Sequence, residues 1–114
     1  MRDVTEIALF TDDVAAAAAF YRSLVGAAPV AEWPGGALFA AGDAKILVHE
    51  RAAAMEGGPP NEDHFALTVD DLDTICDALR SEGSELLVEP RDYQWGRSAY
   101  LRDPDGRLVE LAQA

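Results

Sequence analysis

Two stretches of this chain follow the same pattern in register, and each begins with an ionisable side chain. The first starts at Glu6 and reads EIALFTDDV; the second starts at His64, 58 residues later, and reads HFALTVDDL. Towards the end of each half, the tripeptide LVH that ends at His49 matches the tripeptide LVE that ends at Glu110. Carboxylates and imidazoles are common ligands of zinc and the first-row transition metals, and both groups carry protons. These residue types therefore suggest metal-assisted or acid–base chemistry.

The elements that must position these residues repeat as well. Residues 4–11 are expected to form a strand, with Ile7, Leu9 and Thr11 on one side and Glu6, Ala8 and Phe10 on the other. Asp12 or Asp13 then caps an alanine-rich helix that ends at Gly26. The predicted buried stripe of this helix consists of Val14, Ala17, Ala18, Tyr21, Leu24 and Val25. Short strands over residues 29–33, 37–41 and 45–50 complete a βαβββ module.

The second half follows the same plan. A strand over 63–69 leads to a helix that is capped by Asp70 or Asp71 and ends at Gly83. The apolar side of this helix consists of Leu72, Ile75, Cys76 and Leu79. A short strand over 86–89 stops at Pro90, and strands over 96–102 and 107–112 form a hairpin across an Asp-Pro-Asp-Gly turn.

Together these patterns predict one α+β domain over residues 1–114. Module one covers residues 1–51, a linker rich in glycine and proline covers 52–61, and module two covers 62–114. The two βαβββ modules are expected to form an incomplete, curved barrel of mixed sheet with the helices outside.

Period-two alternation separates the ionisable residues from the apolar ones. Strand residues such as Ile7, Val48 and Leu111 fall on one face, which is apolar and can pack on helices. The opposite face carries Glu6, Ala8, His49, His64, Ala66, Leu108 and Glu110. The alanines leave space beside the polar groups, and a curved sheet would gather these side chains in a concave pocket.

Composition narrows the possible partners. The chain has 114 residues, 49% of them hydrophobic, and a formal net charge of −12. Nucleic-acid binding needs clustered Lys and Arg, so this charge argues against it, although it permits a cationic ligand. No apolar run reaches the roughly 18 residues of a membrane span, and no leader is expected before the first strand. Cys76 is the only cysteine, so no intrachain disulfide can form and a cytoplasmic location is expected.

The combined motifs resemble the vicinal oxygen chelate superfamily, which includes glyoxalases, bleomycin-resistance proteins and extradiol dioxygenases. The resemblance rests on EIAL with Asp13, on FY ahead of LVG at residues 20–26, on HFAL, and on DPDG ahead of the final VEL. It implies paired βαβββ modules in an open barrel, usually in a homodimer whose sites lie between modules. Whether the modules pair within one chain or across the dimer stays open.

In metal-using members of that superfamily, the ligands come from the first and last strands of each module. By motif these positions are Glu6, His64 and Glu110 here, and the LVH/LVE match adds His49. Two imidazoles and two carboxylates suit a divalent ion of nickel, zinc, cobalt, manganese or iron. The ion would act as a Lewis acid on a small substrate with vicinal oxygens, with Glu110 or Glu6 moving the proton.

Glu6 and His49 also have simpler interpretations. The first ligand of the family is commonly His or Gln, so Glu6 is a departure, and it can equally be a carboxylate exposed at a strand edge. His49 can be an ordinary histidine at a strand end. If no metal is bound, Glu6 and Glu110 should repel one another, which would raise the pKa of one of them.

The alternative function needs no metal. Members that sequester antibiotics use the same concave surface, lined by aromatic and acidic side chains. The aromatic residues that could line such a pocket, or belong to the core, are Trp33, Phe39, Tyr93, Trp95 and Tyr100. Arg97 is a candidate for binding a substrate carboxylate or phosphate, or is simply solvated.

The sequence therefore favours a glyoxalase-like metalloprotein of the isomerase, lyase or epimerase type, with a metal-free, antibiotic-binding protein as the alternative. Whether the protein is an enzyme, and which substrate it takes, stays open.

Overall fold

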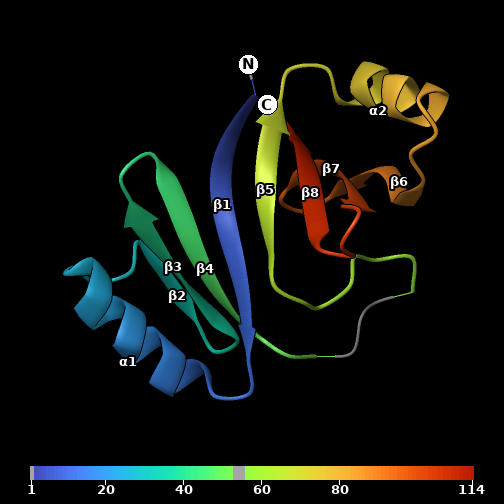
Figure 1. The fold of residues 1–114 in the computed structure, drawn as a ribbon. Coiled ribbons are helices and arrows are strands. Elements are labelled where there is room, and N and C mark those ends of the chain that lie inside the picture. The colour runs from blue at the N-terminus through green and yellow to red at the C-terminus, as the bar shows by residue number, and fades with distance from the viewer. Residues whose placement is uncertain (1, 53–55) are drawn as a thin grey trace.

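The computed structural model describes residues 2–52 and 56–114, and within them two βαβββ modules share one sheet of eight strands (Figure 1). The first module consists of β1 (Arg2–Thr11), α1 (Val14–Val25), β2 (Ala31–Trp33), β3 (Gly36–Ala41) and β4 (Ala44–Glu50). The second consists of β5 (His64–Val69), α2 (Leu72–Ser81), β6 (Leu86–Tyr93), β7 (Gly96–Arg102) and β8 (Leu108–Gln113). The predicted pair of modules is confirmed, while residues 53–55 of the predicted linker lie outside the described residues.

The two modules meet at β1 and β5, which run antiparallel and side by side at the centre of the sheet (Figure 1). The sheet order is β2-β3-β4-β1-β5-β8-β7-β6. In each module the last strand runs parallel to the first, with β4 beside β1 and β8 beside β5. The modules therefore pair within one chain, and their first strands form the seam.

Both helices begin at an aspartate cap, because these short side chains satisfy backbone N–H groups that have no partner inside the helix. Asp13 accepts a hydrogen bond from the Ala16 backbone N–H at 3.0 Å, and Asp71 accepts one from Thr74 at 3.4 Å. α1 ends at Gly26, whose φ of 80° lies in the left-handed region that glycine adopts without strain. The sequence left two candidate caps for each helix, Asp12 or Asp13 and Asp70 or Asp71. In both helices the second aspartate, Asp13 or Asp71, is the cap.

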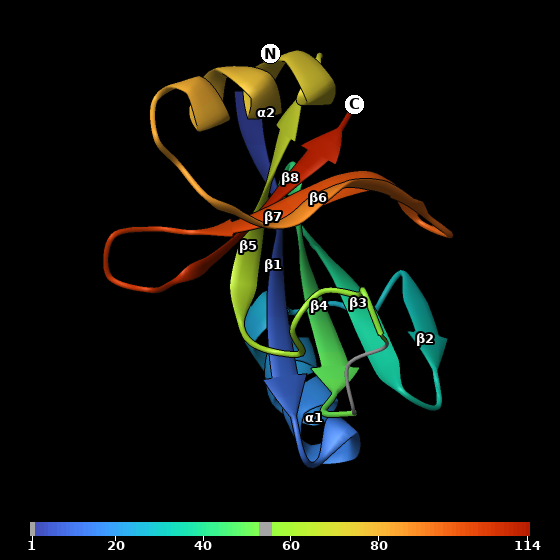
Figure 2. The same ribbon diagram turned by 90° about the vertical axis from the view of Figure 1, so that its right-hand side faces the viewer.

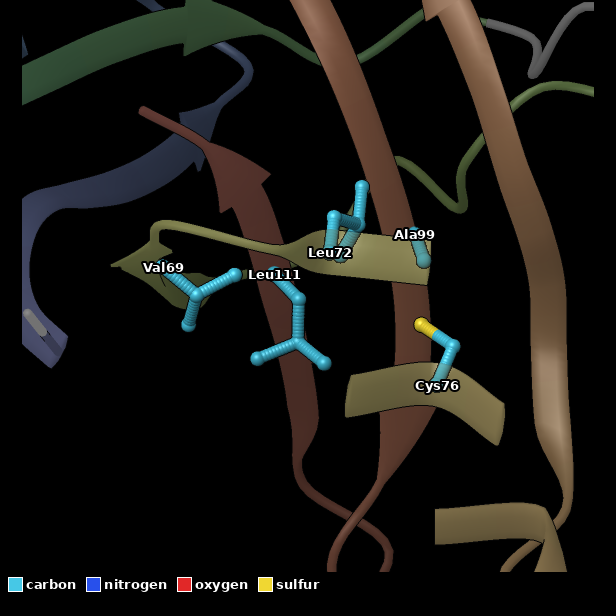
Figure 3. Packing of buried hydrophobic residues seen from close by; sticks show 5 residues of the cluster. All are labelled: Val69, Leu72, Cys76, Ala99 and Leu111. Carbon is cyan, nitrogen blue, oxygen red and sulfur yellow. The ribbon is translucent and has the colours of Figure 1, made fainter. Parts of the chain in front are cut away.

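Both helices pack on the same side of the sheet, which we term the helix face. Between α2 and the sheet lies a buried cluster formed by Val69, Leu72, Cys76, Ala99 and Leu111, of which Leu72 and Cys76 belong to the helix (Figure 3). Beneath α1 lies a smaller cluster formed by Ala37, Phe39 and Val48. Leu24, which belongs to the predicted stripe of α1, is instead 67% exposed. α1 has no fully buried residue of its own, so it covers its half of the sheet less tightly than α2 does.

β6 is longer than the sequence predicts. Its expected end at Pro90 is wrong, because the strand continues to Tyr93. β6 forms the edge of the sheet, where the N–H that proline lacks is not needed for pairing. The pairing of β6 with β7 is irregular between Val88 and Arg91, which accommodates the proline. The extension adds Arg91 and Tyr93 to the sheet.

The sheet is strongly twisted, so that β6 and β7 run across the direction of β1 and β4 (Figure 2). α1 and α2 cover opposite ends of the sheet and leave β1 and β5 between them (Figure 1). The side turned away from the helices, which we term the inner face, carries Glu6, Ala8, His64, Ala66 and Glu110 at its centre. None of the described helices is long and apolar enough to cross a membrane.

Candidate functional site

Strand pairing brings three ionisable side chains together at the centre of the inner face. Glu6 pairs with Ala66 across β1 and β5, and Ala66 pairs with Glu110 across β5 and β8. Residues that pair directly point to the same side of a sheet, so the two carboxylates flank a single alanine. His64 lies two residues from Ala66 along β5 and points to the same side. Glu6, His64 and Glu110 therefore share one small area, which we term the acidic centre.

His64 and Glu110 form a buried hydrogen-bonded pair. The imidazole Nε2 lies 3.1 Å from Glu110 Oε1, and the two side chains are only 7% and 9% exposed. Ser98 on β7, itself buried, donates a hydrogen bond through its Oγ to the other carboxylate oxygen, Oε2, at 2.8 Å. Both oxygens of Glu110 are thus held in place by neighbouring side chains.

The hydrogen bonds of His64 define where its proton lies. The ring Nδ1 is 2.9 Å from the backbone carbonyl oxygen of Glu62, and a carbonyl oxygen only accepts, so Nδ1 carries a hydrogen. The contact between Nε2 and Glu110 then requires a second proton, shared between the imidazole and the carboxylate. Burial lowers the pKa of His64, but the hydrogen bonds to Glu110 and Glu62 and the nearby carboxylate charges outweigh it and raise the pKa above 6.5.

Glu6 is the less constrained carboxylate of the acidic centre. No described residue donates a hydrogen bond to it, and it is half-buried. Its pKa is raised above 4.5, first by burial and then by the charge of Glu110, while His64 and Lys45 act in the opposite direction. The direction agrees with the predicted repulsion between the two carboxylates, although burial contributes more to it than Glu110 does.

The matching tripeptides LVH and LVE do not occupy equivalent positions in the paired strands. In module two the residue that faces Glu110 is Ala66, and the equivalent residue of module one, Ala8, faces Leu47. His49 lies two residues beyond Leu47, where its Nδ1 is 2.7 Å from a backbone carbonyl oxygen. Module one therefore presents an apolar side chain where module two presents a carboxylate, and His49 is displaced from the acidic centre.

The acidic centre suits a divalent cation by its donor types and its negative charge. The two carboxylates and the imidazole supply oxygen and nitrogen donors, and the carboxylate of Glu6 has no hydrogen-bonding partner in the described part of the chain. In their present positions, no three His, Cys, Asp or Glu side chains of the described residues surround a common point. His64 and Glu110 bind one another through a proton that a cation can replace.

Aromatic rings lie on both sides of the acidic centre. On one side Phe10 approaches the His64 ring, with 6.0 Å between the ring centroids. On the other side Tyr100 meets His64 edge-on at 5.9 Å and also contacts Tyr93 at 6.4 Å. Tyr93 stacks on Trp95 at 4.4 Å with the two planes 3° apart. The second module thus provides an aromatic wall beside the ionisable residues.

Two predicted pocket residues lie on the helix face instead. Phe39 is fully buried beneath α1. Arg97 forms ion pairs with Asp73 of α2 at 3.0 Å and with Asp92 of β6 at 3.2 Å. Because side chains alternate along a strand, each points away from the inner face that its neighbours occupy. Trp33, on the edge strand β2, is 40% exposed and lies at the far rim of the first module.

Residues 91–97 are expected from the sequence to form the rim of the pocket, but three polar residues of the inner face are not among the candidate site residues that the sequence suggests. Lys45 pairs with Glu6 across β1 and β4, Ser98 holds Glu110, and Arg91 pairs with Ser98 across β6 and β7. Alternation from Tyr100 would have placed Ser98 on this face, but nothing in the sequence marks its hydroxyl as a partner of Glu110. Arg91 could not be placed without the extension of β6 beyond the proline.

A sequence model of the Glyoxalase/Bleomycin resistance protein/Dioxygenase superfamily matches residues 4–111. The chain belongs to this superfamily. The match spans both modules and every residue of the acidic centre, and it confirms the resemblance inferred from the repeated motifs.

Individual relatives agree with this placement. The glutathione transferase FosA of Serratia marcescens is 26% identical over 113 residues, which cover 97% of this chain and 80% of that protein. A probable lactoylglutathione lyase of Synechocystis sp. is 38% identical over 52 residues, which cover 44% of this chain and only 40% of the relative. Methylmalonyl-CoA epimerase from Mycobacterium tuberculosis, 24% identical, superposes with a TM-score of 0.76 over 96% of this chain and 86% of that one, which shows a shared fold.

Proposed function

We propose that the acidic centre binds a divalent metal ion and that the protein acts on a small substrate with vicinal oxygens. The observation that carries this proposal is the buried His64–Glu110 pair, held by Ser98 on one side and by the Glu62 carbonyl on the other. A hydrogen bond from the far ring nitrogen to a carbonyl is the support that metal-binding histidines commonly have. The names of the relatives, a lyase and a transferase, support an enzyme of this general type.

In this proposal the residues of the acidic centre have different roles. His64 and Glu110 form the fixed part of the ligand set, because their orientation is determined by neighbouring groups. A divalent ion bound there would polarise the oxygens of the substrate and stabilise negative charge on them. Glu6 is free of hydrogen bonds from described residues and has a raised pKa, so it either completes the ligand set or takes up a proton from the substrate.

Metal analysis of paired variants tests the proposal. Protein purified without chelators is expected to carry about one transition-metal ion per chain. His64→Gln and Glu110→Gln should lose the ion, whereas the matched controls His49→Gln and Glu32→Gln should keep it. Loss of the ion from His49→Gln as well would contradict the ligand set, and a metal-free parent protein would contradict the proposal itself.

A second candidate function, metal-free binding of a cationic aromatic ligand, is favoured by the ring contacts. A run of contacting rings passes through His64 of the acidic centre, from Phe10 on one side to Tyr100 and Tyr93 on the other. It ends in the stack of Tyr93 on Trp95. Cations bind both to aromatic faces and to carboxylates. Saturable quenching of tryptophan fluorescence by a basic aromatic drug, in protein that binds no metal, would favour this function over the enzyme.

We also propose that the protein forms a homodimer through the helix face. Between α1 and α2, strands β1 and β5 expose three apolar side chains, Val4 (51%), Ile7 (42%) and Phe65 (38%). Ile7 and Phe65 occupy equivalent positions in the two modules and pair across the seam, so the strip has approximate two-fold symmetry. A hollow of about 730 Å³ opens beside Ile7 and Phe65, and Leu9 contributes to its wall. A second copy is the partner that matches a symmetric surface.

A further inference from the structure

Arg91 and Tyr93 lie together on the inner face, beside the acidic centre but outside it. Arg91 pairs with Ser98, the residue that holds Glu110, and Tyr93 is the next residue of β6 on the same side. The guanidinium carbon of Arg91 is 5.5 Å from the centre of the Tyr93 ring. Two hydrogen-bond donors, one of them charged, therefore share a small area at the edge of the sheet.

Arg91 has no carboxylate partner among the described residues. The chain has 21 Asp and Glu residues and only nine Lys and Arg, and five other arginines do form ion pairs. Arg97, which the sequence suggested as an anion-binding residue, is occupied by Asp73 and Asp92. The guanidinium of Arg91 instead donates to the backbone carbonyl of Gly57 at 2.6 Å and is otherwise exposed. Its positive charge is thus available to a ligand.

The hydroxyl of Tyr93 is buried and has no hydrogen-bond partner in the described structure. A buried polar group without a partner costs roughly 1–3 kcal/mol, so native proteins rarely keep one without a reason. Burial raises the pKa of Tyr93, while Arg91 lowers it and Glu110 raises it, so the hydroxyl is protonated and both charges act on it. The hydroxyl is therefore a donor without an acceptor, near enough to Arg91 and Glu110 to feel the charge of both.

We propose that Arg91 and Tyr93 form a subsite for an anionic oxygen group, a carboxylate or phosphate, carried by the substrate. The guanidinium supplies charge and the phenol supplies a second donor, the combination that anionic oxygens favour. Trp95, stacked on Tyr93, keeps the phenol ring in place. This inference rests on the proposed function, because it assigns one end of the substrate to the subsite and the vicinal oxygens to the acidic centre.

The experiment uses inorganic phosphate and acetate as separate probes of metal-free protein dialysed against a chelator. In a Trp33→Phe background, Trp95 is the only tryptophan and reports directly on the stacked Tyr93. Two or three charge-assisted hydrogen bonds predict saturable binding with a dissociation constant on the order of millimolar. The probe that binds more tightly identifies the anionic group as phosphate or carboxylate.

Three variants separate the subsite from general charge effects. Arg91→Gln should raise the dissociation constant about tenfold or more. Tyr93→Phe should raise it roughly fivefold without lowering the melting temperature, because the Tyr93 hydroxyl has no hydrogen bond to lose. Arg22→Gln, on α1, removes the same charge and should leave binding unchanged.

Several outcomes would overturn the subsite. These are no saturable response to either probe, an equal loss of binding in Arg22→Gln, or unchanged binding in Tyr93→Phe. Absence of anion binding in protein that still takes up metal overturns the subsite alone. Absence of metal with intact anion binding overturns the proposed metal centre alone.

Discussion

The proton shared by His64 and Glu110 predicts an unusual pH dependence of stability in the metal-free protein. His64 has a raised pKa in the folded state, so the folded protein holds this proton more tightly than the unfolded chain does. The stabilisation is fully present below the unfolded pKa of about 6.5 and is lost as the pH rises through the folded pKa. The raised pKa of Glu6 acts in the same direction from pH 4.5 upwards. The free energy of unfolding should therefore fall as the pH rises above 6.5.

The size of this pH dependence follows from the linkage between proton binding and folding. One additional proton held by the folded state corresponds to a slope of up to about 1.4 kcal/mol per pH unit. Solvent screens the interaction between His64 and Glu110 little, since their side chains are only 7% and 9% exposed. Replacing either partner removes the pair, so His64→Gln and Glu110→Gln should both flatten the slope above pH 6.5. His49→Gln changes a histidine of the same face that is displaced from the pair, and should keep the slope.

Urea unfolding at pH values from 5 to 9, in the presence of a chelator, measures this dependence directly. The reasoning would be refuted if the parent protein became more stable above pH 6.5, or if His64→Gln kept the parental slope. If the slope vanished only in His49→Gln, the proton would be held by His49 and not by His64, which would also refute the reasoning.

Three further predictions concern the surroundings of the acidic centre. Ser98→Ala should weaken metal binding about 10- to 100-fold in a calorimetric titration, because Glu110 loses the donor that orients it. Unchanged affinity would show that Ser98 is only a core residue. Leu72→Ala should cost about 2–5 kcal/mol of unfolding free energy in urea, since Leu72 is the first residue of α2 and is fully buried against the sheet. A loss below about 1 kcal/mol would contradict the described packing. Phe65→Lys should convert the proposed dimer into monomers in analytical ultracentrifugation, whereas Leu87→Lys, at the exposed sheet edge, should not; dimers in both variants would place the interface elsewhere.

Local features of the fold follow from the sequence because their causes are local. The repeated segments at Glu6 and His64 predict the two modules, and short side chains such as Asp13 and Asp71 predict the starts of the helices. Alternation within a strand also places Glu6, His64 and Glu110 opposite the helices, since it depends only on the pleat of one strand. Strand length is less secure, and the extension of β6 beyond Pro90 depends on that strand having a free edge.

The composition of the acidic centre depended on pairing between strands that are distant in the chain. Register decides that Leu47 rather than His49 is the counterpart of Glu110, and a tripeptide match cannot detect that displacement. Pairing also determines that Ser98 holds Glu110, while Arg97 meets the aspartates on the helix face. Sequence alone therefore determined the two modules and the face on which Glu6, His64 and Glu110 lie. Only the tertiary structure decided which side chains meet, because burial, register and charge depend on residues far apart in the chain.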